Sequence, residues 1–348
     1  MQAVILAGGI DSNILVVVYK LSMNLIRKLR VFLKSRELFR NWFSAGLKYY
    51  LSRYGLDVKY IKIKCGNNRR YMLTRYMYSI IVNAYYDGLF KLLCDGGLVG
   101  RFWGIVDLLD KDGRLILRLP DGCLLDIDSF DPVVLAETWL HEIHYLGFDL
   151  TNWIVLDIGA FVGDTALYYA KRGAFVVAVE PLPNNYETMM KNLGLNPDLK
   201  PRIVPINAAV AGKDGFIDVK YDGRIDGDAS AYTTSRFTAR VRTMKLSTLI
   251  KELEGMGIDI NKFKVRVLKT DCKGCEYEVE DDDALRLFDI VKIEYSGYLV
   301  NKTYHVLKEK LEAMGFRCRA WAHNDIALRI GLDRHGTLTC IKQGMLML

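Results

Sequence analysis

The chain has 348 residues, of which 51% are hydrophobic and 26% charged. This length and apolar content support one enlarged domain or two domains with a buried core, and they exclude a wholly disordered, collagen-like or repeat protein. The net charge of +7 is unevenly divided, because residues 1–80 hold 15 Lys and Arg against 3 Asp and Glu, whereas the remainder holds 33 against 38. We therefore expect a basic N-terminal region whose role differs from that of a mildly acidic body.

Seven cysteines are scattered along the chain. A secreted disulfide scaffold is denser and usually has an even number of cysteines, so we expect a reducing compartment and a cytoplasmic location. The apolar start at residues 4–18 is interrupted by Gly8, Gly9 and Asp11 before it reaches the roughly 20 residues of a membrane span. We expect neither a secretory signal nor a spanning helix there.

Residues 1–110 are predicted to form a basic, mainly helical N-terminal extension. Apolar residues recur at three- and four-residue steps from Leu25 to Tyr54, and a second mostly helical stretch is expected over 71–109. Residues 58–64 alternate like a strand and are followed by a loop at 66–68. Three roles stay open for this extension: a helical cap that packs on the rest of the chain, a nucleic-acid-binding region, or a peripheral membrane contact through residues 20–54.

Residues 111–348 are predicted to form an α/β domain. A hairpin (113–128) and a helix (132–146) lead into a core over 151–300 and a C-terminal part over 301–348. Strands are expected at 153–159, 175–180, 202–210, 266–271, 291–295, 316–322 and 337–342, a hairpin at 215–221 with 237–244, and helices near 163–172, 184–193, 246–255 and 301–314. Apolar strands alternating with helices predict a doubly wound, mostly parallel, seven-stranded sheet.

The motif VLDIGAFVGDTALYYA, residues 155–170, places a strand before a glycine-bearing turn that begins a helix. In α/β sheets the ligand crevice lies at the carboxyl ends of such strands, where Gly159 and Gly163 let the backbone approach a ligand. Free N–H groups with Asp164 and Thr165 at the helix start could hold a ligand carboxylate.

An acidic residue, Glu180, ends the next strand, 21 positions after Gly159. An acidic side chain at that place can accept hydrogen bonds from both hydroxyls of a ribose, so the ligand should contain a nucleoside. The dinucleotide fingerprint needs a second glycine to make room for pyrophosphate, and this chain has Phe161 there. Asp157 would repel pyrophosphate but attract the ammonium and sulfonium of S-adenosylmethionine. These residues favour S-adenosylmethionine over NAD and disfavour a nicotinamide oxidoreductase.

The segment VLDIGAFVGDTALYYAKRGAFVVAVEPLPNNYETMMKNLGLN resembles the first two motifs of class I S-adenosylmethionine-dependent methyltransferases. Three later segments follow in order: INAAVAGKDG (206–215), TMKLSTLI (243–250), and LKTDCKGCEYEV (268–279) with VKIEY (291–295). Together they are similar to the FkbM family, whose later motif usually reads K-I-D-V-E-G-x-E. The resemblance covers about residues 130–320 and implies a Rossmann-like methyltransferase fold.

Carried over position by position, the resemblance implies which residues line the cofactor. Glu180 would take the ribose, with Pro181 and Asn185 nearby, while Asn207 and Ala208 would lie beside the adenine. The methionine end would be lined by Asp157, Gly159, Ala160, Phe161, Gly163, Asp164 and Thr165, and the methyl group would face Asp271. The chain departs from the family pattern at Lys273, where glutamate is usual, and at Cys275, where a small alanine is usual. Lys273 is expected to leave the acceptor side more positive, which would suit an anionic acceptor.

Methyl transfer to a hydroxyl needs a base that takes the acceptor proton. The candidate catalytic residues are Asp271, Glu294 and Glu276, and the first two stand at or near the carboxyl ends of neighbouring predicted strands. Each has a structural alternative: Asp271 could cap its loop or bind cofactor, Glu294 could brace the sheet edge, and Glu276 could stabilise a helix start.

Two short clusters invite a metal or redox interpretation. Cys272 and Cys275 have the two-residue spacing of zinc and thiol sites, and His141 and His144 lie three positions apart on one predicted helix. Neither cluster has enough further ligands nearby in the sequence. We expect small buried thiols at the first place and no metal at either.

The sequence therefore predicts a cytoplasmic S-adenosylmethionine-dependent methyltransferase that methylates a hydroxyl of a sugar, a glycan or another small molecule. Oxygen is favoured as the acceptor atom because nothing resembles the Asn-Pro-Pro-Tyr segment of many amino-group methyltransferases. Two alternatives stay open: an RNA methyltransferase that grips RNA through its basic N-terminal region, and a non-catalytic scaffold that keeps only the cofactor fold. Neither the acceptor nor the oligomeric state follows from the sequence.

Overall fold

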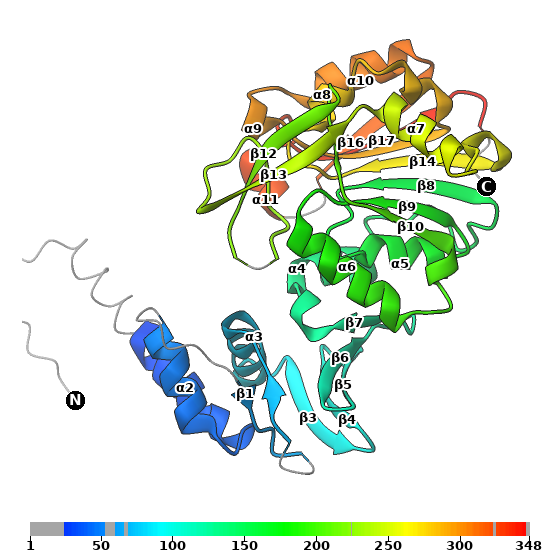
Figure 1. Cartoon of the computed structure of the whole chain (residues 1–348). Coiled ribbons are helices and arrows are strands. Elements are labelled where there is room, and N and C mark those ends of the chain that lie inside the picture. Colours follow the sequence, from blue (N-terminus) through cyan, green and yellow to red (C-terminus); the bar gives the residue numbers. More distant parts are fainter. Residues whose placement is uncertain (1–23, 53–59, 66–68, 224, 323–324, 346–348) are drawn as a thin grey trace, which may run out of the picture. The chain divides into compact units, whose positions relative to one another are not determined.

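A computed structural model describes residues 24–52, 60–65, 69–223, 225–322 and 325–345 (Figure 1). The chain divides into two compact units, Met1–Arg118 and Leu119–Leu348, which are described separately. The apolar start at 4–18 and the loop expected at 66–68 lie outside the described residues. Within the described ranges, no helix is long and apolar enough to cross a membrane.

The N-terminal unit combines helices with antiparallel strands. Residues 24–34 are helical, and they are followed by η1 (Ser35–Glu37), α2 (Trp42–Leu51) and α3 (Arg75–Tyr86). The short strands β1 (Tyr60–Ile61) and β2 (Tyr71–Met72) pair with each other. Four strands of an antiparallel meander complete the unit: β3 (Phe90–Asp95), β4 (Leu98–Phe102), β5 (Val106–Lys111) and β6 (Arg114–Arg118).

The helical stretch predicted over 71–109 is confirmed at Arg75–Tyr86 and is wrong from Phe90 onward. Two tight turns explain the difference, because Gly96-Gly97 and Trp103-Gly104 all adopt positive φ angles. Paired left-handed residues reverse the chain and match the twist of the flanking strands, so the segment folds as hairpins.

The C-terminal unit is built on a seven-stranded sheet in the order β10-β9-β8-β14-β15-β17-β16. Every pairing is parallel except those made by β17, which is antiparallel to both of its neighbours. The strands are β8 (Trp153–Ile158), β9 (Phe175–Val179), β10 (Ile203–Ile206), β14 (Val265–Thr270), β15 (Ile290–Ser296), β16 (Phe316–Trp321) and β17 (His335–Lys342). The predicted doubly wound, mostly parallel sheet is confirmed, as are the positions of six of its strands. The strand expected over 202–210 divides into β10 and β11 (Ala209–Val210), and β11 belongs to another sheet.

Helices cover both faces of this sheet. α5 (Asp164–Lys171) and α6 (Pro183–Leu195) lie on one face, and α7 (Leu246–Gly255) and α10 (Tyr304–Ala313) lie on the other (Figure 1). Because strand side chains alternate between faces, Leu156 and Leu268 join one apolar core with Leu249 and Leu311 of these last helices. The residues that follow them along β8 and β14 point to the α5 side.

Smaller elements connect the layers. β12 (Gly215–Tyr221) and β13 (Phe237–Met244) form the predicted hairpin, and β11 (Ala209–Val210) pairs with β13. The remaining elements are β7 (Leu124–Asp126), η3 (Ile127–Ser129), α4 (Pro132–Leu135), η4 (Ala136–Leu140), η5 (Lys200–Arg202), η6 (Ile260–Lys262), α8 (Glu276–Val279), η7 (Asp283–Leu287), α9 (Gly297–Val300) and α11 (Asp325–Ile330). The helix predicted over 132–146 ends at Leu140, because Glu142 takes a positive φ of 45°.

Six cysteines form three disulfides: Cys65–Cys94, Cys272–Cys275 and Cys318–Cys340. The seventh, Cys123, is free and buried. Free thiols were expected at Cys272 and Cys275, and that expectation is wrong. Cys318 and Cys340 meet because the β16–β17 register places them directly opposite each other, which a single sequence does not reveal.

Candidate active site

The turn after β8 begins the candidate site. Gly159, Phe161 and Gly163 all have positive φ, at 79°, 49° and 80°. A Cβ on Gly159 would lie 1.9 Å from the carbonyl oxygen of Asp271, so only glycine allows the turns after β8 and β14 to touch. The amides of Gly159 and Ala160 both donate to Val179 O, at 2.9 and 3.0 Å, which anchors the turn to the end of β9.

Glu180 follows β9 and is 4% exposed. Its carboxylate accepts hydrogen bonds from the amide of Phe161 at 2.9 Å, the amide of Leu182 at 2.9 Å and Asn185 Nδ2 at 3.1 Å. Burial raises the pKa of Glu180 to about 8, although these three donors oppose the shift. A carboxylate offers about four acceptor positions, so Glu180 retains capacity for a ligand hydroxyl.

Asn207 follows β10 and lies beside the same strand ends. Its Nδ2 donates to Glu180 O at 2.8 Å and to Pro181 O at 3.1 Å. Ala208 is fully buried behind it. These contacts fix the exposed Asn207 next to the backbone of Glu180, so the predicted ribose and adenine residues lie together.

Asp157 lies under the turn and is fully buried. Its Oδ1 lies 2.9 Å from Lys269 Nζ of β14, and its Oδ2 accepts a hydrogen bond from Thr165 Oγ1 of α5. Burial disfavours the charged form of Lys269, yet the carboxylates of Asp157 and Asp271 raise its pKa. Sequence analysis did not predict Lys269 as a site residue. Its position inside the apolar strand RVLKTD could have indicated a buried lysine that needs an acidic partner.

Asp164, the first residue of α5, also faces inward. It accepts a hydrogen bond from Thr138 Oγ1 of η4 at 3.2 Å, and burial raises its pKa to about 7. Asp164 and Thr165 therefore hold the turn from behind. Thr138 was not anticipated, because it lies 26 positions away in a segment predicted only as a helix.

Two candidate catalytic residues, Asp271 and Glu294, meet Lys273 at the carboxyl ends of β14 and β15. Lys273 Nζ lies 3.0 Å from Asp271 Oδ1 and 3.1 Å from Glu294 Oε1. Burial would raise the pKa of Asp271, but the ammonium groups of Lys273 and Lys269 lower it to about 2. The free positive charge expected from Lys273 is absent, because two carboxylates balance it.

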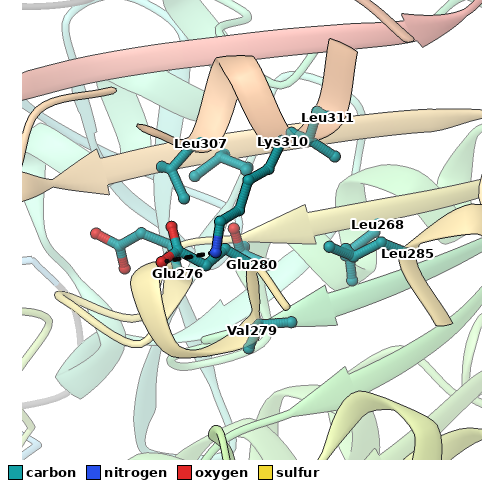
Figure 2. Close-up of a pocket in the computed structure, with 10 residues that line it drawn as sticks. Leu268, Glu276, Val279, Glu280, Leu285, Leu307, Lys310 and Leu311 are labelled. Carbon is teal, nitrogen blue, oxygen red and sulfur yellow. Dashed lines mark ion pairs between the residues drawn. The ribbon is translucent and has the colours of Figure 1, made fainter. Parts of the chain in front are cut away.

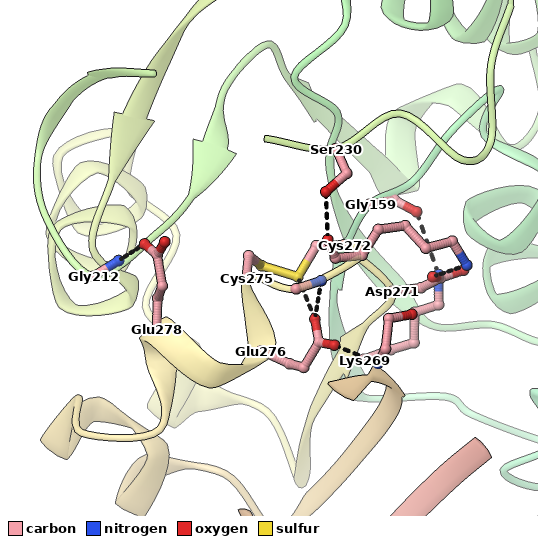
Figure 3. Close-up of a disulfide and its surroundings, with 12 residues drawn as sticks. Gly159, Gly212, Ser230, Lys269, Asp271, Cys272, Cys275, Glu276 and Glu278 are labelled. Atoms are coloured by element: carbon pink, nitrogen blue, oxygen red, sulfur yellow. Dashed lines mark hydrogen bonds and ion pairs between the residues drawn. A yellow bond between two sulfur atoms is a disulfide. The ribbon is translucent and has the colours of Figure 1, made fainter. Parts of the chain in front are cut away.

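Glu276 begins α8 and lies behind this cluster. It is 2% exposed and accepts hydrogen bonds from the amides of Gly274 at 2.8 Å and Ser296 at 2.6 Å (Figure 3). Burial raises its pKa to about 7. Glu276 thus ties the loop after β14 to the end of β15. It stands at the start of α8 as expected, but it is buried and not solvated there.

Residues 157–318 match the family model described as the methyltransferase FkbM domain. This segment is an FkbM methyltransferase domain. The order of its sheet is that of the Rossmann-like methyltransferase fold, with the candidate site where the strand order reverses, between β8 and β14.

Solved structures with similar arrangements include other transferases. A methyltransferase FkbM from Methylobacillus flagellatus KT is 15% identical over 57% of this chain and 45% of its own, with a TM-score of 0.35. An S-adenosylmethionine-dependent methyltransferase from Agrobacterium tumefaciens is 12% identical over 74% of this chain and 78% of its own, with a TM-score of 0.32. A putative transferase from Pyrococcus horikoshii is 15% identical over 90% and 98%, with a TM-score of 0.31. The chain thus spans less than half of the first of these proteins. No curated protein matches it.

The connection between β12 and β13 of the FkbM domain reaches both sides of the site. Asn185 Nδ2 donates to Asp226 O at 3.0 Å, and the Asp226 amide donates back to Asn185 Oδ1 at 3.1 Å. Ser230 Oγ donates to Lys273 O at 2.6 Å (Figure 3). The sequence predicts only that this segment connects the two strands of a hairpin. It does not indicate that the segment contacts both Asn185, next to Glu180, and Lys273.

A cavity on the other face of the FkbM domain is separate from this constellation. It lies beneath α10 and is lined mainly by aliphatic side chains, with Lys310 Nζ 3.3 Å from Glu280 Oε1 at its edge (Figure 2). Of the predicted site residues, only Glu276 lines it. It belongs to the apolar packing of α10 on the sheet.

A metal site finds limited support in the described part of the chain. The one group there with convergent ligand atoms is Cys272, Cys275 and Glu276, whose atoms lie within 4.8 Å of one another. The two sulfurs are bonded to each other, and both oxygens of Glu276 accept backbone hydrogen bonds. His141 and His144 belong to no such group among those residues.

Proposed function

We propose that the protein is an S-adenosylmethionine-dependent methyltransferase that methylates a hydroxyl oxygen of a sugar, a glycan or another small molecule. Glu180 carries this proposal: a buried carboxylate at the carboxyl end of β9 that is hydrogen-bonded to the amide of Phe161 in the glycine turn. This is the position from which an acidic side chain receives a ribose in doubly wound folds. The FkbM domain supports methyl transfer as the reaction class.

The residues at the strand ends fit S-adenosylmethionine by the chemistry of their donors and acceptors. Glu180 offers acceptor capacity to the ribose diol, and Asn207 lies on the adenine side. The turn Gly159–Phe161 borders the methionine end, with its three amides already hydrogen-bonded to Val179 O and Glu180. Asp157 does not touch the cofactor in this assignment, because Lys269 and Thr165 occupy its two oxygens; it holds the turn from below.

The bound cofactor would supply a methyl group on a sulfonium, which is displaced in line by the acceptor oxygen. The protein aligns the acceptor and excludes water, which contributes much of the rate enhancement in such a displacement. Asp271, with a pKa of about 2, is a weak base, so we assign it to orienting the acceptor hydroxyl. We assign to Glu294 the role of the base that accepts the proton of the acceptor hydroxyl. Lys273 holds both carboxylates in position.

Isothermal titration of the full chain with S-adenosylmethionine and with its demethylated product tests the cofactor assignment. At a pH of about 9, where Glu180 is ionised, Glu180→Ala should weaken binding about tenfold to a hundredfold, because a hydrogen bond to a charged group contributes about 1.5–3 kcal/mol. Glu187→Ala, an exposed position of the neighbouring α6, is the matched control and should leave affinity unchanged. Equal affinities for both variants would remove Glu180 from the ribose, and no binding to the parent chain at high micromolar concentration would refute the cofactor.

Transfer of a labelled methyl group distinguishes the acceptor classes. We expect label on hydroxylic small molecules or glycans and a product that survives conditions which hydrolyse esters. Label on RNA, together with RNA binding that falls steeply with added salt, would favour the RNA methyltransferase alternative. Cofactor binding without any transfer would favour the scaffold.

A further inference from the structure

The Cys272–Cys275 disulfide closes the loop that follows β14 (Figure 3). Its sulfurs belong to residues only three positions apart, and both side chains are partly buried against the apolar core. Cys340 of the disulfide between β16 and β17 is, by contrast, fully buried. Its partner Cys318 is partly buried, as are both cysteines of the loop pair. A thiolate must reach a sulfur to exchange with a disulfide, so the loop pair offers two partly exposed cysteines to attack and the other pair offers one.

Reduction of this pair should leave the fold intact. A disulfide stabilises a protein mainly by restricting its unfolded chain, and the restriction grows with the length of the closed loop. The loop pair spans a separation of 3, whereas Cys318 and Cys340 are 22 residues apart. Opening the shorter ring therefore costs the domain little stability.

The ring encloses Lys273 in an uncommon backbone conformation. Lys273 has φ of 52°, which non-glycine residues adopt rarely, and Gly274 has φ of 117°. A Cβ on Gly274 would meet the ring of Tyr232 at 2.4 Å, so the loop is also packed from outside. The disulfide constrains this backbone, and the backbone in turn aims the Lys273 ammonium at Asp271 and Glu294.

A proton donor and acceptor lies beside the pair. Glu276 Oε2 lies 3.5 Å from Cys272 Sγ. Burial raises the pKa of Glu276 to about 7, so its carboxyl exchanges protons near neutrality. Reductive opening of a disulfide releases a thiolate that must be protonated, and Glu276 is placed to protonate Cys272.

We infer that Cys272 and Cys275 form a reversible thiol–disulfide site that exchanges with dithiols, and that its redox state sets the position of Lys273 between Asp271 and Glu294. A thiolate of the dithiol attacks one sulfur of the pair, forming a mixed disulfide, and the other cysteine leaves as a thiolate and takes a proton. The second thiol of the reductant attacks the mixed disulfide and releases the remaining cysteine. The dithiol is oxidised to a disulfide, and its two electrons and two protons reside on Cys272 and Cys275.

Graded reduction of the full chain with dithiothreitol tests the exchange. After alkylation of free thiols, peptide mass spectrometry reports the state of each cysteine. We expect Cys272 and Cys275 to be half-reduced at a dithiothreitol concentration at least about tenfold lower than Cys318 and Cys340, because either cysteine of the loop pair can be attacked whereas Cys340 is fully buried. Reduction of both pairs together, or a Cys272–Cys275 pair that is still oxidised when Cys318–Cys340 opens, would overturn the site.

Amide hydrogen exchange tests the coupling to Lys273. The Gly274 amide is hydrogen-bonded to Glu276 in the closed loop. Selective reduction, or the double variant C272S/C275S, should speed its exchange about tenfold or more, whereas the matched variant C318S/C340S should leave it unchanged. Equal exchange in all forms would refute the coupling. Neither measurement uses cofactor or methyl transfer, so these outcomes are separate from those of the proposed function.

Zinc titration of the reduced chain tests whether Cys272, Cys275 and Glu276 form a metal site instead. We expect weak zinc binding, because two thiolates and a carboxylate that already accepts two backbone hydrogen bonds fall short of a structural zinc site. Tight binding of one zinc per chain that is lost in C272S/C275S would overturn the redox assignment.

Discussion

Lys269 of β14 places its ammonium 2.9 Å from Asp157 Oδ1 of β8, at a depth where the two side chains are 4% and 0% exposed. The parallel register of the two strands sets Lys269 directly beside Asp157. A charge so deeply buried is tolerated only with its partner, and removing one partner leaves an uncompensated charge. The pair is therefore a structural requirement of the turn that carries the cofactor residues.

Replacing Lys269 with methionine should destabilise the C-terminal unit by about 3–5 kcal/mol, the usual cost of breaking a buried pair from one side. Urea unfolding followed by a probe in this unit measures the change. The double variant D157L/K269M should recover much of the loss, because both charges of the pair are removed together. The exposed pair Arg242–Glu252 supplies the control, and Arg242→Ala should cost under about 1 kcal/mol. A Lys269→Met effect as small as this control would contradict the interpretation.

The cofactor-free C-terminal unit should lose stability as pH rises from about 5 to 8. Burial raises the pKa of Glu180 to about 8 and those of Asp164 and Glu276 to about 7. Each folded-state pKa lies above its unfolded value, so between the two values the folded state binds more protons and stability falls with pH. Asp271 affects stability in a different pH range. Because its folded-state pKa of about 2 lies below its unfolded value, its contribution to stability is lost only under strong acid.

Melting temperatures at intervals from pH 5 to 8.5 measure this slope. Asp164→Asn removes one titrating group but can still accept from Thr138, so the slope should flatten by about one proton. Asp218→Asn, at an exposed position of β12, should leave the slope unchanged. A melting temperature that rises through this range in the parent chain would contradict the assignment of buried carboxyls.

Lys273→Met should raise the pKa of Asp271 from about 2 by at least about two pH units, because one of the two ammonium groups that stabilise its charge is removed. The groups facing Asp271 are Lys273, Lys269 and His144, and the last two are retained. Carboxyl carbon NMR of the labelled protein reports the titration. Lys220→Met in the β12 hairpin is the control, and an unshifted Asp271 would show that Lys273 does not set its charge.

The same substitution should reduce methyl transfer roughly tenfold to a hundredfold while leaving cofactor affinity unchanged, because the proposed mechanism assigns Lys273 to the acceptor side. Lys273→Arg should recover part of the rate, since it restores a cation between the two carboxylates. Loss of cofactor affinity in Lys273→Met would instead place this residue on the cofactor side.

The N-terminal unit should bind vesicles that contain anionic lipid. Leu25, Leu29 and Leu33 are 69%, 56% and 45% exposed, and Arg30 and Lys34 lie on the same helical stretch. Apolar side chains beside basic ones bind a membrane surface, and added salt weakens the electrostatic part. Cosedimentation should show binding at low salt that L29S/L33S reduces and that Leu328→Ser, an exposed leucine of the other unit, leaves unchanged. An absence of binding to anionic vesicles at low salt would remove the membrane role.

The sheet of the C-terminal unit was predictable because each buried strand is a short apolar run flanked by turn residues. The positions of Gly159 and Glu180 were predictable as well, because each directly follows the end of a predicted strand, β8 for Gly159 and β9 for Glu180. Residues 90–109 were mispredicted because their hairpins depend on left-handed turns, one of them at Trp103, that composition does not announce.

The contacts between charged side chains in the site could not be predicted from the sequence. Lys269 meets Asp157 across a parallel register that joins strands more than a hundred residues apart, and no local pattern specifies that register. Lys273 could be seen as a departure from the family motif, but its neutralisation requires Glu294 from the next strand. The disulfide partners were equally hidden, because cysteine connectivity cannot be deduced from one sequence.

The contact between Gly159 and the Asp271 carbonyl has a consequence for protein engineering. Because only a hydrogen on Gly159 fits against that oxygen, a redesigned loop after β14 must keep its backbone in place or displace the turn after β8. A graft intended to change the acceptor would then impair cofactor binding as well. The connection between β12 and β13 meets the site through Asp226 and Ser230 without taking part in this contact, so acceptor preference is best altered from there.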